Sequence, residues 1–211
     1  LKFTADIHEV TYTRVAGNGF EENDEVGVFA LVGSSTMKEE RYADNLRFFR
    51  TSEKVFESSE PIYYPDDEVT LRLISYYPYQ EEGVNMGEST MSVAVETDQN
   101  LSAGYFCSDF LVASQNLQSA PKGAIALHYD HKFFKLKIAL VGKEGEELQG
   151  ILDADPKLSV CGFYTKAIYD FQKETYSAFS NEKSITPAGK WEIQGDRLSG
   201  KEVILIPQET T

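Results

Sequence analysis

In the stretch KFFKLKIALV, residues 132–141, large apolar side chains occupy every second position from 134 to 140, and Lys135, Lys137 and Ala139 lie between them. Successive side chains of a strand point to opposite faces, so this alternation predicts a β-strand with one apolar face. That face consists of Phe134, Leu136, Ile138 and Leu140. No long segment of the chain shows the 3.6-residue period of an amphipathic helix, which makes strands the expected regular structure.

Similar short runs occur along the whole chain, separated by Gly, Asn, Asp, Ser or Pro. Before residue 132 they are LKFTADIH (1–8), EVGVFALV (25–32), EVTLRLISYYPY (68–79), TMSVAVET (90–97) and AIALHYDH (124–131). After residue 150 they are KLSVCGFY (157–164), KAIYDF (166–171), KWEI (190–193) and KEVILIP (201–207). Many short strands joined by turn residues predict an all-β sandwich or barrel of mostly antiparallel strands.

The composition shifts at VGKEGEELQG, residues 141–150, where an apolar strand gives way to Gly, Lys and Glu. We place a domain boundary there, which gives an N-terminal β domain at 1–143 and a C-terminal β domain at 144–211. The second part has about four predicted strands, whereas a two-sheet sandwich usually needs about seven. It therefore either uses strands of the first part or is incomplete.

The charge of the chain excludes some function classes. With 34 acidic and 20 basic residues, the formal net charge is −14, and the sequence contains no basic cluster that would attract nucleic acid. Cys107 and Cys161 lie in apolar segments, which favours two buried free thiols, although one disulfide would be possible in an oxidising compartment.

Catalytic and metal-binding motifs are not found. In HYDH, residues 128–131, a strand would place His128 and Asp130 on one face and His131 on the other, so the three cannot converge on one ion. The acidic runs at 21–25 and 66–68 lack the spacing of a calcium loop and are interpreted as solvated turns. There is no nucleophile elbow, zinc-protease motif or phosphate loop, so we expect neither enzymatic activity nor a cofactor.

Two groups of residues are candidates for function. The first is the alternating amino-terminal strand followed by Arg14, Val15 and a glycine-containing loop; its apolar positions are Leu1, Phe3, Ala5 and Ile7. The second is a group of tyrosines between prolines, which could form a binding surface for glycans or, alternatively, pack within a sheet. These are Tyr63, Tyr64, Tyr76, Tyr77 and Tyr79.

Several segments, taken in order, resemble the fimbrillin-like, or Mfa-like, proteins, which are subunits of type V pili. They are the first strand with Thr13-Arg14, NDEVGVFAL (23–31), YADN (42–45), PIYYPDD (61–67), ISYYPY (74–79), SDFLVA (108–113) and LHYDHKFFKLKIAL (127–140). The resemblance implies two tandem transthyretin-like β-sandwich domains. The segment VILIPQ, 203–208, resembles a strand that precedes the end of the second domain in relatives, so that domain is expected to be partial here.

The resemblance also implies a function. Such a protein would be exported as a lipoprotein precursor to the outer membrane and would assemble with other pilus subunits, supporting adhesion or biofilm formation. An arginine-specific protease would cut after Arg14, and another subunit's strand would replace residues 1–14. The alternatives are a tip or accessory subunit, or a monomeric cell-surface module that binds a host or bacterial receptor such as a glycan.

Overall fold

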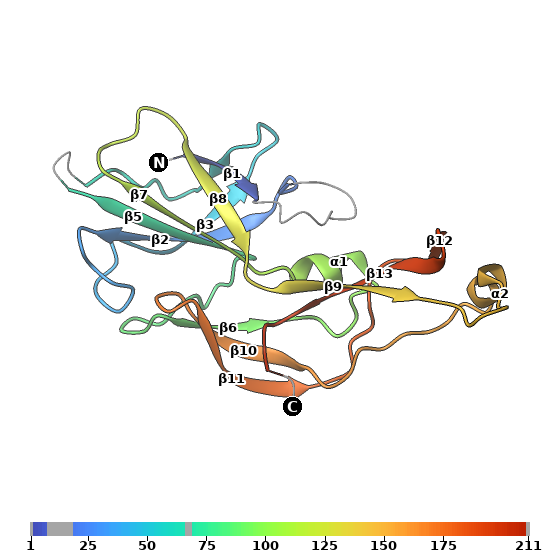
Figure 1. Ribbon diagram of the computed structural model, residues 1–211. Coiled ribbons are helices and arrows are strands. Elements are labelled where there is room, and N and C mark those ends of the chain that lie inside the picture. The colour runs from blue at the N-terminus through green and yellow to red at the C-terminus, as the bar shows by residue number, and fades with distance from the viewer. Residues whose placement is uncertain (1, 8–18, 66–68, 210–211) are drawn as a thin grey trace. The chain divides into compact units, whose positions relative to one another are not determined.

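The computed structural model describes residues 2–7, 19–65 and 69–209, and its regular structure is nearly all β (Figure 1). The predicted all-β fold class is confirmed, with the sheets in a β-sandwich-like arrangement. The strands are β1 (Phe3–Ile7), β2 (Glu25–Val32), β3 (Ala43–Arg50), β4 (Phe56–Glu57), β5 (Leu71–Tyr77), β6 (Thr90–Ala94), β7 (Leu111–Leu117), β8 (Ile125–His131), β9 (Phe134–Leu140), β10 (Tyr164–Asp170), β11 (Thr175–Glu182), β12 (Glu192–Gln194) and β13 (Arg197–Leu205). The helices are α1 (Ser102–Cys107) and α2 (Leu148–Asp153). Neither helix is long or apolar enough to cross a membrane, and the same holds for the whole described part of the chain.

The chain forms two compact units, each built from segments that are separate in the sequence. The first unit contains residues 1–91, 110–132 and 169–175, and the second contains residues 92–109, 133–168 and 176–211. The units interleave along the chain because strand pairing joins segments that are far apart in sequence. A single domain boundary between residues 143 and 144 stays a prediction.

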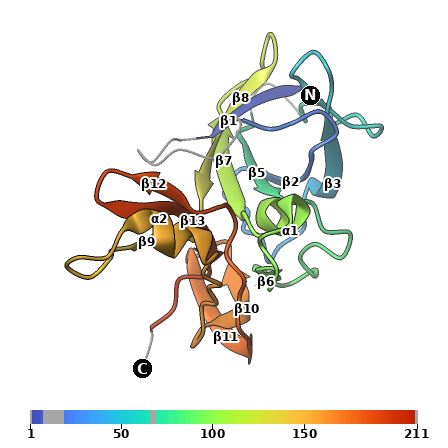
Figure 2. The ribbon, with the colours of Figure 1, turned by 90° about the vertical axis from the view of Figure 1, so that its right-hand side faces the viewer.

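Seven strands of the first unit form a closed barrel in the order β1-β4-β3-β2-β5-β7-β8 (Figure 2). Strand β2 pairs antiparallel with both β3 and β5, and all its residues from Val26 to Leu31 are buried. A strand buried on both faces needs apolar residues at successive positions, which explains why β2 does not alternate. Gly27 is required here because a Cβ would lie 2.2 Å from the Tyr76 ring.

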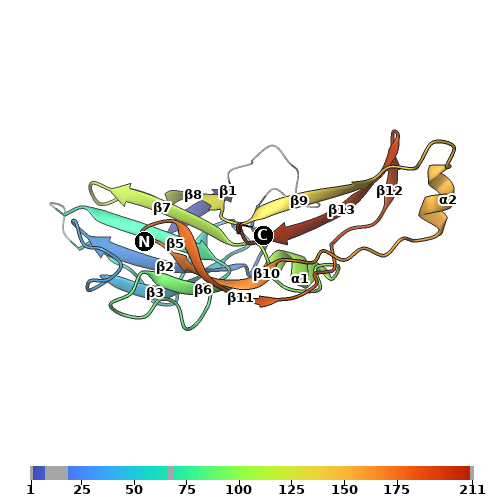
Figure 3. The same ribbon diagram turned by 60° about the horizontal axis from the view of Figure 1, so that its bottom comes forward.

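In the second unit β9 pairs along β13, and β12 pairs with the beginning of β13 (Figure 3). Phe134 and Leu136 lie opposite Leu205 and Val203 and therefore share a face with them. The two β13 residues are fully buried, whereas Phe134 and Leu136 are 39% and 40% exposed. The predicted alternation of β9 is present, but its apolar face is only partly covered. A further sheet has the order β11-β10-β6.

The prediction that both cysteines are buried is wrong, although both thiols are free. Cys107 is the last residue of the short helix α1 rather than part of a strand, and it is exposed. Cys161 follows the isolated bridge formed by Val160 and precedes β10. Its exposed Sγ lies 3.2 Å from Oγ of Ser184. The apolar neighbours of each cysteine in the sequence did not reveal whether its thiol faces the core or the solvent.

The phenol of Tyr129 lies inside the barrel with no exposed surface, 2.6 Å from Oγ of Ser75. Oγ of Ser75 donates its proton to the carbonyl oxygen of Gly27 at 3.0 Å, so the phenol must donate to Ser75. Burial raises the pKa of Tyr129 well above its usual value, since a phenolate there would lose its hydration. The bond to Ser75 acts in the opposite direction but is the weaker effect.

We therefore predict that alkaline pH destabilises the fold through Tyr129. Above about pH 10 the unfolded chain releases this proton and the folded chain retains it, so the free energy of unfolding should fall by up to about 1.4 kcal/mol per pH unit for this group. Tyr129→Phe should cost about 0.5–1.5 kcal/mol at neutral pH but has no proton to release. Urea unfolding should show the two stability curves converging above about pH 10.

The control is Tyr63→Phe, at a side chain that is 72% exposed. At neutral pH this substitution should change the free energy of unfolding by less than about 0.5 kcal/mol. A constant offset between Tyr129→Phe and the unsubstituted chain across the pH range would contradict the assignment of Tyr129 as a group that stays protonated in the core.

Candidate functional site

Strand β1 occupies the seam of the barrel, between β4 and β8. It pairs in parallel with β8 along its whole length, from Phe3 opposite Ile125 to Ile7 opposite Tyr129. On its other flank, among the residues that the structure describes, only Phe3 pairs, with Phe56 of the two-residue strand β4. The strand is therefore attached to the barrel mainly along one edge.

The ring of Phe3 fills an aromatic socket at this seam. Its side chain is 1% exposed, and its ring centroid lies 4.7 Å from that of Phe48 and 5.3 Å from that of Phe56. Phe20 continues the socket with edge-to-face contacts to Phe56 at 5.2 Å and to Tyr129 at 5.0 Å. Such ring pairs add about 0.5–1.5 kcal/mol to the free energy of burying their area. One side chain of β1 thus provides most of its apolar anchoring.

The outer face of β1 carries charged contacts instead. Asp6 forms an ion pair with His128 of β8, and Lys2 Nζ lies 2.5 Å from a carboxylate oxygen of Glu57 in β4. All four side chains are substantially exposed, and exposed pairs of this kind contribute little to stability. These contacts align β1 with its neighbours but do not lock it in place.

The described residues include part of the predicted removable strand. Phe3 is fully buried, and Ala5 and Ile7 are partly buried and pack against the same core cluster. Leu1, Arg14 and Val15 lie outside the described residues, so the processing site stays a prediction. The socket residues Phe20, Phe48 and Phe56 were not predicted, because isolated aromatic residues in different strands do not reveal which partner they share.

The predicted tyrosine group does not form one surface. The side chain of Tyr63 is 72% exposed, whereas that of Tyr76 is fully buried in contact with Phe29 and Phe171. Tyr64 is partly buried, and its hydroxyl donates to the carbonyl oxygen of Val69 at 2.6 Å. Tyr77 and Tyr79 are also partly buried. Tyr76 cannot contribute to a binding surface.

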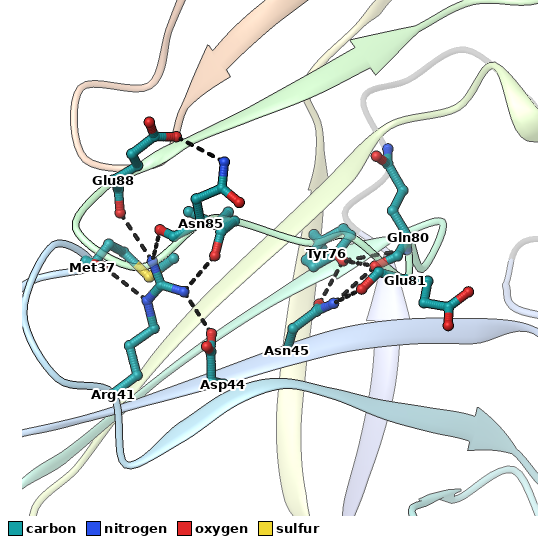
Figure 4. Close-up of polar contacts among 10 residues, drawn as sticks. Met37, Arg41, Asp44, Asn45, Tyr76, Gln80, Glu81, Asn85 and Glu88 are labelled. Atoms are coloured by element: carbon teal, nitrogen blue, oxygen red, sulfur yellow. Dashed lines mark hydrogen bonds and ion pairs between the residues drawn. The ribbon is translucent and has the colours of Figure 1, made fainter.

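Instead, Tyr76 fixes the loop that follows β5 (Figure 4). Its hydroxyl lies 2.7 Å from Oδ1 of Asn45 and 3.0 Å from the carbonyl oxygen of Gln80. Asn45 has a left-handed backbone, with φ at 48°, and its Nδ2 donates to the carbonyl oxygens of Gln80 and Glu81. Asparagine tolerates this conformation better than most residues. The loop is therefore held by side chains of two strands of the first unit.

Arg41 fixes the remainder of the same loop (Figure 4). Its guanidinium donates to the carbonyl oxygens of Met37, Val84, Asn85 and Glu88 at 2.6–3.0 Å and pairs with Asp44 at 2.5 Å. It also lies over the ring of Phe29, 5.3 Å from the centroid. Arg41 is 6% exposed, so its five polar contacts replace the water that burial removes.

No group of three or more His, Cys, Asp or Glu residues within 2–7, 19–65 and 69–209 is placed to hold a metal ion. His128 contacts Asp6 of β1 rather than forming a site with Asp130 and His131. His128, Asp130 and His131 therefore lie in strand β8, where they pair with residues of β1 and β7.

A closed β-barrel with its first strand at the seam is compatible with many functions. The family is therefore identified by comparison with known proteins. Residues 13–211 match the fimbrillin-like family. The chain belongs to the fimbrillin-like family. Members of this family are structural proteins and not enzymes. No match was found among curated proteins.

Three solved structures are similar in fold to this fimbrillin-like chain. A candidate cell adhesion protein from Bacteroides ovatus ATCC 8483 has a TM-score of 0.65 at 16% identity, over 100% of this chain and 78% of its own. A candidate cell adhesion protein from Bacteroides uniformis ATCC 8492 has a TM-score of 0.60 at 20% identity, with coverages of 89% and 70%. A fimbrial protein from Bacteroides vulgatus ATCC 8482 has a TM-score of 0.57 at 16% identity, with coverages of 98% and 77%. These similarities concern the fold.

We predict that Phe3→Ala weakens the attachment of β1 far more than a change at its neighbour. Removing a buried phenylalanine ring typically costs about 3–5 kcal/mol. Thr4→Ala, on the exposed face of the same strand, should change stability by less than about 0.5 kcal/mol. Hydrogen exchange of the β8 backbone should accelerate in the Phe3 variant alone. Equal effects of the two substitutions would show that the socket does not hold the strand.

We also predict that Arg41→Ala destabilises the first unit by about 3 kcal/mol or more, because two buried and two partly buried carbonyl oxygens would lose their donor. Arg47→Ala is the matched control, since Arg47 is exposed and contacts Glu25 at the surface. Guanidinium unfolding should separate the two variants clearly. A stability loss for Arg41→Ala no larger than that of the control would contradict the proposed role of Arg41.

Proposed function

We propose that this chain is a structural subunit of a type V pilus that assembles by exchange of its first strand and supports adhesion or biofilm formation. Membership of the fimbrillin-like family, together with the fold shared with fimbrial and cell adhesion proteins, supports a pilus-type adhesion subunit that associates with other subunits at the cell surface. Export as a lipoprotein precursor to the outer membrane belongs to the same proposal.

The position of β1 is the observation that carries the exchange mechanism. Removal of β1 would open the barrel between β4 and β8, expose the backbone edge of β8 and empty the socket of Phe3. An open edge with apolar pockets at alternate positions is the kind of surface that accepts an added strand. A donor strand would need an aromatic or large aliphatic side chain at the position of Phe3.

Cleavage after Arg14 would not by itself release the strand. Burial of Phe3 contributes on the order of 1.5–3 kcal/mol, and each backbone hydrogen bond adds about 0.5–1.5 kcal/mol net. The cut instead converts an intramolecular contact into one between two chains, which an incoming strand can displace. The pairing of β1 mainly along β8 reduces the number of contacts that must be broken at once.

A tip or accessory subunit remains an alternative within the same family. The second alternative, a monomeric glycan-binding module that uses the tyrosine group, is not favoured, because Tyr76 lies in the core and Tyr64 bonds to the backbone. A receptor on a host or bacterial surface would have to use other residues.

Exchange can be measured with a fluorescent peptide of residues 1–14, the chain's own first strand. After treatment with an arginine-specific protease, and with mass spectrometry confirming the cut between Arg14 and Val15, the cut protein should incorporate the peptide and the uncut protein should not. A peptide with Phe3→Ala should incorporate at least about tenfold more weakly, because it cannot fill the socket.

Arg14→Lys is the matched control, since it preserves the charge but not the recognition by the protease. This variant should neither be cut at residue 14 nor exchange. If the correctly cut protein unfolds, or if it remains folded and incorporates neither peptide nor a strand of another subunit, the exchange mechanism is wrong.

A further inference from the structure

The second unit contains a pocket of about 630 Å³ near α2 and β12, at the end of the β9–β13 pair where β13 begins. Figure 3 shows α2 and β12 near this end of the pair. Its polar lining includes Lys157, Lys190 and Lys201, and its apolar wall includes Leu152, Leu158 and Trp191. A volume of this size lies within the usual range of sites for small ligands.

Two close backbone crossings build the pocket. Gly189 and Gly200 both have positive φ, at 82° and 101°. A Cβ on Gly189 would lie 1.9 Å from the carbonyl oxygen of Gly200, and a Cβ on Gly200 would lie 2.2 Å from the carbonyl oxygen of Lys190. The pairing of β13 with β9 also shifts register between Leu198 and Lys201, which indicates a bulge. The two glycines and the bulge bring Lys190 and Lys201 to the same pocket.

The cationic groups of this pocket are incompletely neutralised. Neither Lys190 nor Lys201 forms an ion pair with any residue in the described part of the chain, although the protein has 34 acidic residues. Lys157 pairs with Asp155, an acidic residue that also lines the pocket. Burial, followed by the proximity of Lys157, lowers the pKa of Lys201, and Asp155 acts in the opposite direction. An anion beside Lys201 would favour its charged form and oppose this lowering of the pKa.

We propose that this pocket binds an acidic saccharide, a sugar ring that carries a carboxylate or a sulfate. The ammonium groups of Lys190 and Lys201 would bind the acidic group, as charge-assisted bonds of this kind are the strong ones. Leu152 and Leu158 would contact the apolar face of the ring, and Asn100 and Thr186 offer an amide and a hydroxyl for its hydroxyl groups.

An acidic peptide fits the pocket less well. Peptides often bind by adding a strand to an open edge. The segments at the pocket already pair with each other: the backbones of Ala188 and Glu202 exchange two hydrogen bonds, and Asp98 bridges to Thr186. A compact, ring-shaped anion requires no free strand edge. The proposal goes beyond pilus assembly and does not depend on strand exchange.

Calorimetry on the uncut chain tests this proposal. The probes are sialyllactose and a hyaluronan tetrasaccharide, which carry carboxylates, and a sulfated chondroitin disaccharide; the comparisons are neutral lactose and the peptide EENDEV of residues 21–26. At least one acidic saccharide should bind more tightly than both comparisons, and more weakly as salt is raised from about 25 mM to about 300 mM. Which of these saccharides binds shows whether the pocket prefers a carboxylate or a sulfate.

Lys190→Gln and Lys201→Gln should each weaken this binding by about tenfold while circular dichroism shows an unchanged fold. Lys166→Gln on β10 is the control, because Lys166 is exposed and does not line the pocket, and it should bind normally. The proposal is overturned if lactose or the peptide binds as tightly as every acidic saccharide, or if the pocket variants bind like the control. Because the uncut chain is used, failure here leaves the exchange mechanism untouched.

Discussion

The contact between Phe3 and the aromatic rings of Phe48 and Phe56 is the interaction on which the barrel of the first unit depends. A closed barrel has no open edges, and here closure requires a strand of five residues with one fully buried anchor. Elsewhere the barrel is joined by longer antiparallel pairs such as β2 with β5 and β5 with β7. Loss of the first strand would therefore open the barrel between β4 and β8 but leave the pairs β4–β3, β3–β2, β2–β5, β5–β7 and β7–β8 in place.

The position of β1 explains how one structure could be both stable and able to exchange a strand. Its alignment depends on a parallel pairing with β8, and its anchoring depends largely on one ring. Under the proposed exchange mechanism, a donor segment would have to match this register and supply the ring. The loop after β5 differs from β1, because the many polar contacts of Arg41 and Asn45 hold it in a single conformation.

The sequence predicted most strands that have a regular alternation or a continuous apolar run, but it did not predict β3, β4, β7 or β11. Strands β1, β2, β8 and β9 follow their predicted segments closely. Strand β11 was not predicted, because Ala178 and Asn181 adopt positive φ and interrupt the alternation of its side chains. For Tyr76 the sequence left two alternatives open, a binding surface or packing within a sheet. A tyrosine between polar and proline residues can point either way, and only the position of Asn45 on a neighbouring strand shows that its hydroxyl is satisfied inside.

The net charge of the sequence also failed to predict a local feature, the pocket lined by lysines. A net charge of −14 and the lack of a basic cluster in the sequence describe the field far from the protein, where the acidic majority dominates. Within a Debye length of about 8–10 Å the local arrangement matters more than the total. Lys157, Lys190 and Lys201 come from separate segments but line one pocket, and the glycine crossings and the bulge bring Lys190 and Lys201 to it. An acidic protein can therefore present a local site for an anion, and the backbone conformation at Gly189 and Gly200 is what places it there.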